Sequence, residues 1–73
     1  MPDVSLDVTN LLCPLPVLKT KKAIDSIQSG QNLEVIANNT AAKSDIIYLV
    51  QRLELELTDV SEADSIIRIT IKK

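Results

Sequence analysis

Two prolines within four residues, in the segment Cys13-Pro14-Leu15-Pro16, constrain the fold of this chain more than any other feature. Each proline fixes its φ angle and lacks a backbone N–H. Two prolines this close together fit a helix only in its first turn, where the N–H groups have no intrahelical partner. The prolines therefore predict that a helix begins at this segment, beside the one cysteine of the chain.

The residues on either side of the prolines predict a strand before this helix and a strand after it. Val4, Leu6 and Val8 alternate with polar residues, which is the period of a half-buried strand. Ser29-Gly30 is the expected end of the helix, because glycine readily adopts the left-handed conformation that follows a helix. Residues 33–37 form a second apolar run. A strand, a helix and a strand within about thirty residues predict a right-handed parallel βαβ unit.

The second half of the chain predicts a further helix and two strands. Asn38-Asn39-Thr40 is rich in helix-capping side chains, and an apolar stripe with helical spacing follows it. Residues 53–57 and 67–71 alternate as strands do, with a hairpin connection expected at residues 61–64 and a solvated end at Lys72 and Lys73. We therefore expect one domain over residues 1–73, an α/β (α+β) two-layer βαβαββ sandwich with two helices on one face of a four-stranded mixed sheet.

Composition argues against nucleic-acid and membrane functions. Tyr48 is the only aromatic residue, so bases would have no set of rings on which to stack. The net charge of -2 argues against a surface that binds a phosphate backbone, and no apolar run approaches the roughly 20 residues that span a bilayer. One cysteine cannot form an internal disulfide, and no leader opens the sequence. We expect a cytoplasmic monomer whose partners are proteins.

Several kinds of catalytic chemistry are also missing from the sequence. The chain has no histidine, so it can build neither a Cys-His pair nor a histidine metal site. Its single glycine excludes the glycine-rich loops that hold dinucleotides and phosphates. We therefore expect no metal and no cofactor.

Cys13 is the residue whose position predicts chemistry. It lies at or next to the N-cap of the first predicted helix, where free backbone N–H groups and the helix dipole favour an anion, and hence the nucleophilic thiolate. Pro14 and Pro16 make this site rigid. A free cysteine can also be a buried apolar filler. A filler, however, does not need a helix start that prolines fix.

The outer face of the same helix predicts a surface for a partner protein. Two leucines and two lysines project in the arc that the core does not use: Leu15, Leu18, Lys19 and Lys22. Together they would place apolar area and positive charge beside the thiol. The two leucines could equally be ordinary surface residues, since apolar atoms make up much of any protein surface.

Residues spread over most of the chain resemble the TusA/SirA-type sulfur carrier proteins. They are Leu6-Asp7, Cys13-Pro14-Leu15-Pro16, Lys22-Ala23-Ile24, Gly30, Leu33, Val35 and Asp45-Ile46. The resemblance implies a βαβαββ sandwich whose motif cysteine, here Cys13, carries a persulfide. Family members accept sulfur from cysteine desulfurases or rhodanese-type enzymes and pass it to a reactive cysteine of an acceptor protein. The resemblance thus implies at most a sulfurtransferase-type carrier.

The chain departs from the family pattern near this motif. Asn10 stands where the family usually has glycine, and Asn38-Asn39 stands where many members have acidic residues. Asparagine also adopts the left-handed conformation, so we expect the turn at Asn10 to be kept.

Two other functions stay open. One is a regulatory or protein-binding module that uses the outer helix face, and the other is a redox sensor in which Cys13 is oxidised.

Overall fold

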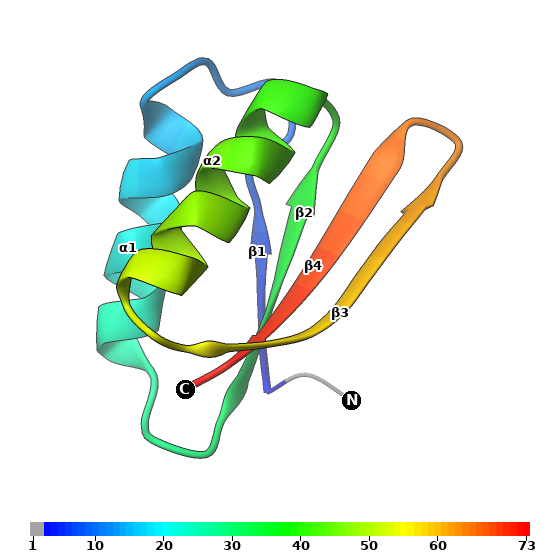
Figure 1. Ribbon diagram of the computed structural model, residues 1–73. Coiled ribbons are helices and arrows are strands. Elements are labelled where there is room, and N and C mark those ends of the chain that lie inside the picture. The colour runs from blue at the N-terminus through cyan, green and yellow to red at the C-terminus, as the bar shows by residue number, and fades with distance from the viewer. Residues whose placement is uncertain (1–2) are drawn as a thin grey trace.

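Six elements follow one another as β, α, β, α, β, β in the computed structural model, which describes residues 3–73. The two helices lie side by side in front of the four-stranded sheet (Figure 1). The predicted order of elements and the two layers are therefore confirmed. The elements are β1 (Val4–Asp7), α1 (Leu15–Ser26), β2 (Asn32–Ala37), α2 (Thr40–Arg52), β3 (Glu56–Ala63) and β4 (Ile66–Lys72).

The sheet has the strand order β1-β2-β4-β3. β1 and β2 are parallel, with Leu6 opposite Val35, and β4 runs antiparallel to both β2 and β3. Because β1 and β2 are parallel and each is followed by a helix, the N-termini of α1 and α2 lie at the same edge of the sheet (Figure 1). Cys13 lies at this edge, in the loop between β1 and α1.

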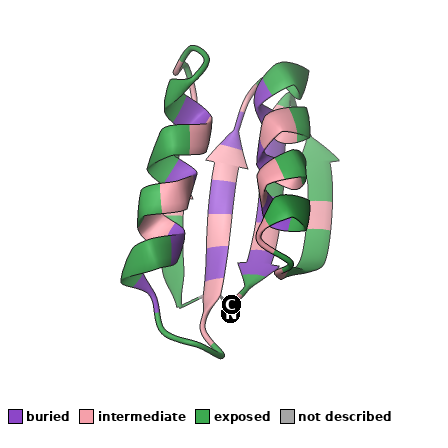
Figure 2. Cartoon of the chain, turned by 60° about the vertical axis from the view of Figure 1, so that its left-hand side comes forward, coloured by how far each residue is buried: buried purple, intermediate pink, exposed green. Residues whose placement is uncertain are grey.

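The core lies between the helices and the inner face of the sheet. Side chains along β2 alternate between buried and half-buried, as the bands on this strand show (Figure 2). β3 is the most exposed of the long strands, with only Val60 half-buried. The buried apolar residues are Val8, Ile24, Ile27, Leu33, Val35, Ala37, Ala42, Ile46, Val50, Ile67, Ile69 and Ile71.

Helix α1 ends at Ser26, so its expected end at Ser29-Gly30 is wrong. Ile27 already has extended backbone and buries its side chain in the core, which takes the chain out of the helix early. Gly30 does have a positive φ of 91°, but it lies in the turn that leads into β2.

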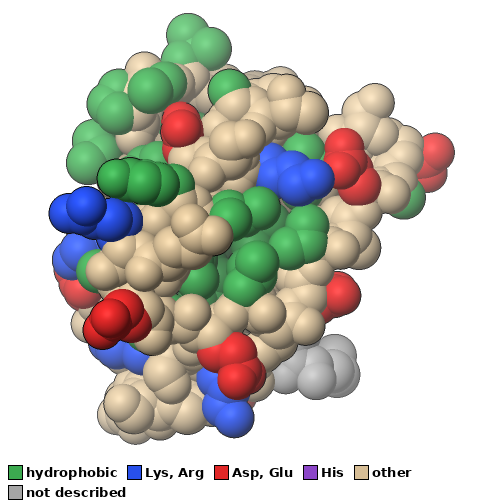
Figure 3. Space-filling model, viewed as in Figure 1, with side chains coloured by type: hydrophobic (Ala, Val, Ile, Leu, Met, Phe, Trp, Pro, Cys, Tyr) green, Lys and Arg blue, Asp and Glu red, His purple; other side chains and the backbone are tan. Residues whose placement is uncertain are grey.

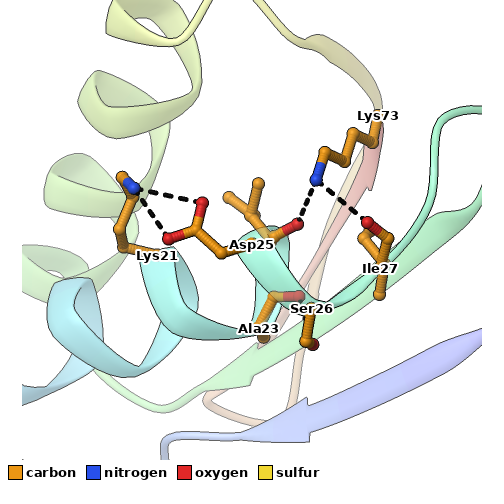
Figure 4. A network of polar contacts seen from close by, with 7 residues as sticks. Lys21, Ala23, Asp25, Ser26, Ile27 and Lys73 are labelled. Atoms are coloured by element: carbon orange, nitrogen blue, oxygen red, sulfur yellow. Dashed lines mark hydrogen bonds and ion pairs between the residues drawn. The ribbon is translucent and has the colours of Figure 1, made fainter.

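The end of the described chain also differs from expectation. Lys73 is half-buried, and its Nζ donates to the carbonyl oxygens of Ile24 and Ile27 at 2.8 and 2.9 Å (Figure 4). A cation at a helix C-terminus satisfies carbonyls that have no partner within the helix and interacts favourably with the helix dipole. Lys73 therefore caps α1 from a position 49 and 46 residues away from the two carbonyl groups, and it is not a solvated end.

The hairpin connection between β3 and β4 is shorter than expected. β3 continues through residues 61–63, and only Asp64 and Ser65 join the two strands. Both have positive φ angles, 53° and 66°, which is the pattern of the two-residue turns that match the twist of a hairpin. The predicted strand start at Leu53 is also wrong. Leu53 is the C-cap of α2, and its N–H donates to the carbonyl of Leu49 at 3.0 Å.

Candidate functional site

Two successive turns carry the chain from the end of β1 to Cys13. The N–H of Val8 donates to the carbonyl of Ile36 at 2.8 Å and so extends the pairing of β1 with β2. The first turn is closed by the N–H of Leu11 on the carbonyl of Val8, and the second by the N–H of Leu15 on the carbonyl of Leu12. Cys13 lies within the second turn, and its thiol is exposed.

Side-chain hydrogen bonds hold the first of these turns on two sides. The Asp7 carboxylate accepts from the N–H and the hydroxyl of Thr9 at 2.8 and 2.6 Å, and these bonds lower the pKa of Asp7. Asn10 has a φ of 63°, so the left-handed turn expected there is present. Its N–H donates to Asn38 Oδ1 at 3.0 Å, and Asn38 Nδ2 donates to Asn10 Oδ1 at 2.9 Å.

Helix α1 begins with prolines and without a side-chain cap. Pro14 is the N-cap residue, and Cys13 immediately precedes it. No side chain among residues 3–73 accepts a capping hydrogen bond from the first turn. Pro16 is buried, and its carbonyl accepts the hydroxyl hydrogen bond of buried Thr20 at 2.7 Å. One proline of the motif is thus packed into the protein, whereas Pro14 is exposed beside the thiol.

Exposed apolar side chains lie on both sides of Cys13 along the chain. Leu15 and Leu18 are 44% and 58% exposed, and Leu12, on the other side of Cys13, is 79% exposed. Hydrophobic side chains gather over the first turns of α1 at the upper left of Figure 3. We call Leu12, Cys13, Pro14, Leu15 and Leu18 the Cys13 surface. Sequence reasoning missed Leu12, although an apolar residue in the loop before Cys13, outside any periodic pattern, could have indicated it.

The two other residues expected on this face, Lys19 and Lys22, lie further along α1. Both are exposed, and they line a shallow pocket of about 260 Å³ together with Leu6, Ala23 and Ser26. The pocket therefore runs along the side of α1 that faces β1. Lys21, by contrast, pairs with Asp25 at 2.9 Å on the same helix (Figure 4).

A second groove, of about 370 Å³, lies between the two helices. Its lining residues are Val17 from α1 and Asp45, Tyr48, Leu49 and Arg52 from α2. The Arg52 guanidinium lies 5.9 Å from the centre of the Tyr48 ring, and that ring is largely exposed. The sequence did not indicate this groove. None of the groove residues is a nucleophile of the kind that Cys13 offers.

Two kinds of feature are missing from residues 3–73. No three or more Cys, Asp or Glu side chains of this range gather where they could hold a metal ion. Within the same range, neither α1 nor α2 has the length and apolar content needed to cross a membrane.

Comparison with known proteins identifies the family. The family model for the sulfurtransferase TusA matches residues 4–73. A provisionally named sulfur carrier protein of Methanocaldococcus jannaschii is 40% identical over 68 residues, which cover 93% of this chain and 91% of that protein. The sulfur carrier protein TusA of Allochromatium vinosum is 35% identical over 97% of this chain and 93% of its own length. The crystal structure of a SirA-like protein from Desulfitobacterium hafniense superposes with a TM-score of 0.83, covering 94% of this chain and 95% of that chain at 22% identity, which shows the same fold. The chain belongs to the TusA sulfurtransferase family.

Proposed function

We propose that this protein is a sulfur carrier that holds one sulfur atom as a persulfide on Cys13 and passes it to a partner protein. The observation that carries the proposal is the position of the only cysteine, exposed in the turn that precedes α1, in a chain of the TusA family. The names of relatives from Methanocaldococcus jannaschii and Allochromatium vinosum support the same role.

The transfer is an exchange of sulfur between two thiols, without net oxidation. The Cys13 thiolate attacks the outer sulfur of a persulfide on a donor cysteine. A new S–S bond forms at Cys13, the donor's S–S bond breaks, and the donor cysteine leaves as a thiolate. The second step is the same reaction with an acceptor thiolate as the attacking group. Cys13 thus returns to its starting state.

The surroundings of Cys13 favour its use as a loading point. The thiolate is the reacting form, and the uncapped start of α1 presents the positive end of the helix dipole beside it. The chain has no histidine to act as a base and no second cysteine to resolve the persulfide. The sulfur must therefore leave to another protein, which supplies the remaining chemistry.

The Cys13 surface offers partners an apolar contact next to the reacting sulfur. Donor and acceptor both have to reach the same thiol, so their footprints overlap and they bind one at a time. Lys19 and Lys22 extend the contact with positive charge, because neither forms an ion pair within residues 3–73. We expect the donor to be a cysteine desulfurase or a rhodanese-type protein, and the acceptor to offer a reactive cysteine. Because this thiol has to stay reduced, we also propose that the protein acts in the reducing cytoplasm.

Mass spectrometry of the intact protein tests the proposal. The protein is incubated with a cysteine desulfurase and cysteine, or with a rhodanese and thiosulfate, and we expect a gain of one sulfur atom that a reductant removes. Cys13→Ser is the matched control, because it keeps the size of the side chain and removes the sulfur. Equal spectra for wild type and Cys13→Ser with both donors would contradict the proposal. Full activity of Cys13→Ser in cells would instead favour a protein-binding module.

A further inference from the structure

We infer that Asn10 and Asn38 form an amide latch that holds the loop of Cys13 in the conformation that partner proteins engage. The inference rests on the sulfur transfer proposed above, and it names two positioning residues for that transfer. Neither residue reacts with sulfur. Their effect passes through the backbone from Asn10 to Cys13, three residues later in the same loop.

The latch consists of two reciprocal hydrogen bonds between residues 28 positions apart. The Asn10 N–H donates to Asn38 Oδ1 at 3.0 Å, and Asn38 Nδ2 donates to Asn10 Oδ1 at 2.9 Å. One bond holds the backbone of Asn10 and the other holds its side chain. The latch therefore joins the loop between β1 and α1 to the loop between β2 and α2.

No other hydrogen bond among residues 3–73 ties residues 9–14 to a distant part of the chain. Thr9 bonds to Asp7 in the preceding strand, and the carbonyls of Leu12 and Pro14 accept from the first residues of α1. The turn bond from Leu11 to Val8 is long, at 3.4 Å. Leu11 packs against the core, but residues 12–14 are exposed. Within residues 3–73, the latch is thus the only hydrogen-bonded link of this loop to another loop.

The backbone of Asn10 makes the latch a conformational restraint as well as a contact. Its φ of 63° is in the left-handed region, which few residues other than glycine adopt readily. Without the latch the loop can leave this conformation, and a partner then has to order the loop when it binds. The exposed thiol remains accessible to small reagents in either case. Loss of the latch should therefore weaken the binding of partner proteins and leave the reaction of Cys13 with small molecules unchanged.

The first test compares Asn38→Ala with Asn39→Ala. Asn38→Ala removes both latch bonds. Asn39→Ala removes the neighbouring side chain, which caps α2 by accepting the N–H of Ala42, and it leaves the loop of Cys13 unchanged. We measure the steady-state rate of sulfur transfer from a desulfurase or rhodanese, and the alkylation rate of Cys13 by iodoacetamide. For Asn38→Ala we expect kcat/KM for transfer to fall about fivefold or more, mainly through KM, with alkylation within twofold of wild type. For Asn39→Ala we expect both rates to stay at the wild-type value.

The second test asks whether the two amides act as a pair. Asn38→Asp keeps the acceptor for the Asn10 N–H, and the Asn10 amide can turn so that its Nδ2 donates to the new carboxylate. Asn10→Asp keeps an acceptor for Asn38 Nδ2 and tolerates the left-handed conformation. Each single variant should transfer sulfur within twofold of wild type. The double variant has two carboxylates at the latch, so its kcat/KM for sulfur transfer should fall as far as that of Asn38→Ala. It should recover, relative to wild type, at about pH 5, where one shared proton restores the bond.

Transfer in Asn38→Ala that equals wild type would overturn the latch while leaving the proposed function intact. The latch would also be overturned if the loss of transfer in the double aspartate variant equalled the sum of the losses in the two single variants and did not recover at low pH. Such losses would reflect the added charge and not a broken pair. Failure of the wild-type protein to gain sulfur from either donor would overturn the proposed function itself. The two failures are therefore distinguishable in one set of measurements.

Discussion

The two helices begin at the same edge of the sheet, but their first turns are built in opposite ways. α2 begins with a capping side chain, since Asn39 Oδ1 accepts the N–H of Ala42 at 2.7 Å. α1 begins with Pro14 at the N-cap and no side-chain cap, and exposed leucines flank the cysteine before it. A cap typically contributes about 1 kcal/mol of stability. The start of α2 therefore stabilises the fold, and the start of α1 leaves that contribution unused.

The opposite end of α1 shows where that helix is held. Lys73 donates to two carbonyls, those of Ile24 in the last turn and of the C-cap residue Ile27, at the end of the helix that is opposite Cys13. The side chains of Thr20, in the middle of the helix, and of Ile24, in its last turn, are buried in the core. α1 is thus anchored along its length and at its C-terminus, while its N-terminus presents a thiol and apolar side chains. Substitutions can test whether the start of α2 serves stability and the start of α1 serves function.

The largest expected effect follows from removing the leucines beside the thiol. In Leu15→Ser with Leu18→Ser, transfer from a donor protein should fall by on the order of a hundredfold, because central apolar contacts of an interface cost about 1–2 kcal/mol each. Stability should change little, since both side chains are exposed. Transfer is measured by mass spectrometry over time, with Leu57→Ser on β3 as the control. If the control lost as much transfer as the double variant, the leucines beside Cys13 would have no special role.

The next largest effect concerns the anchored end of α1. Lys73→Met should lower the free energy of unfolding by about 1–2 kcal/mol, because it removes two charge-assisted hydrogen bonds and the cation at the helix C-terminus. Lys72→Met, at an exposed site on β4, is the matched control and should change stability by less than about 0.5 kcal/mol. Urea unfolding followed by circular dichroism measures both. Equal stabilities of the two variants would show that Lys73 does not anchor α1.

A smaller effect is expected at the capped start of α2. Asn39→Ala should lower the free energy of unfolding by about 1 kcal/mol, whereas Asn39→Asp, which keeps a side-chain acceptor, should stay close to wild type. Neither variant should change sulfur loading of Cys13. Thermal unfolding and intact mass spectrometry measure the two properties in one preparation. A loss of loading in Asn39→Ala with unchanged stability would reverse the assignment of roles to the two helix starts.

The smallest effect comes from the exposed carboxylate of Asp7, the last residue of β1 before the loop of Cys13. Hydrogen bonds from Thr9 lower the pKa of Asp7 below its ordinary value of 3.8, so the folded state favours the ionised form. This contribution to stability is present above pH 3.8 and is lost as the pH falls through the lower folded-state value. Asp7→Asn should therefore be slightly less stable than wild type near neutral pH and equal to it at about pH 2. A difference that grew on acidification would contradict this sign.

Much of the fold was predictable because it depends on neighbours in the sequence. The two prolines required a helix start at residues 14–16, and the structure begins α1 at Leu15. The asparagine before the second apolar stripe indicated the start of α2 and its cap. Alternation indicated three of the strands and an apolar run indicated the fourth, although the hairpin turn was predicted too early. Ser61 and Glu62, which suggested a loop, are polar because β3 is an exposed edge strand.

The candidate site was predictable in part for the same reason. The positions of Cys13, Leu15 and Leu18 on an exposed helix start follow from the prolines and from helical spacing. The exposure of Leu12 did not follow, because residues in a turn have no period that reveals which way they face. The pocket beside Lys19 and Lys22 also needs Leu6 of β1, which only folding brings to α1.

The sequence by itself determined where each helix begins, which faces of the helices are apolar, and that one thiol precedes a proline-fixed first turn. These properties arise from backbone restrictions and side-chain spacing within a few residues. The tertiary structure alone decided the strand order β1-β2-β4-β3, the capping of α1 by Lys73 and the pairing of Asn10 with Asn38. Each of these depends on contacts between segments far apart in the chain, whose free energy no local pattern records.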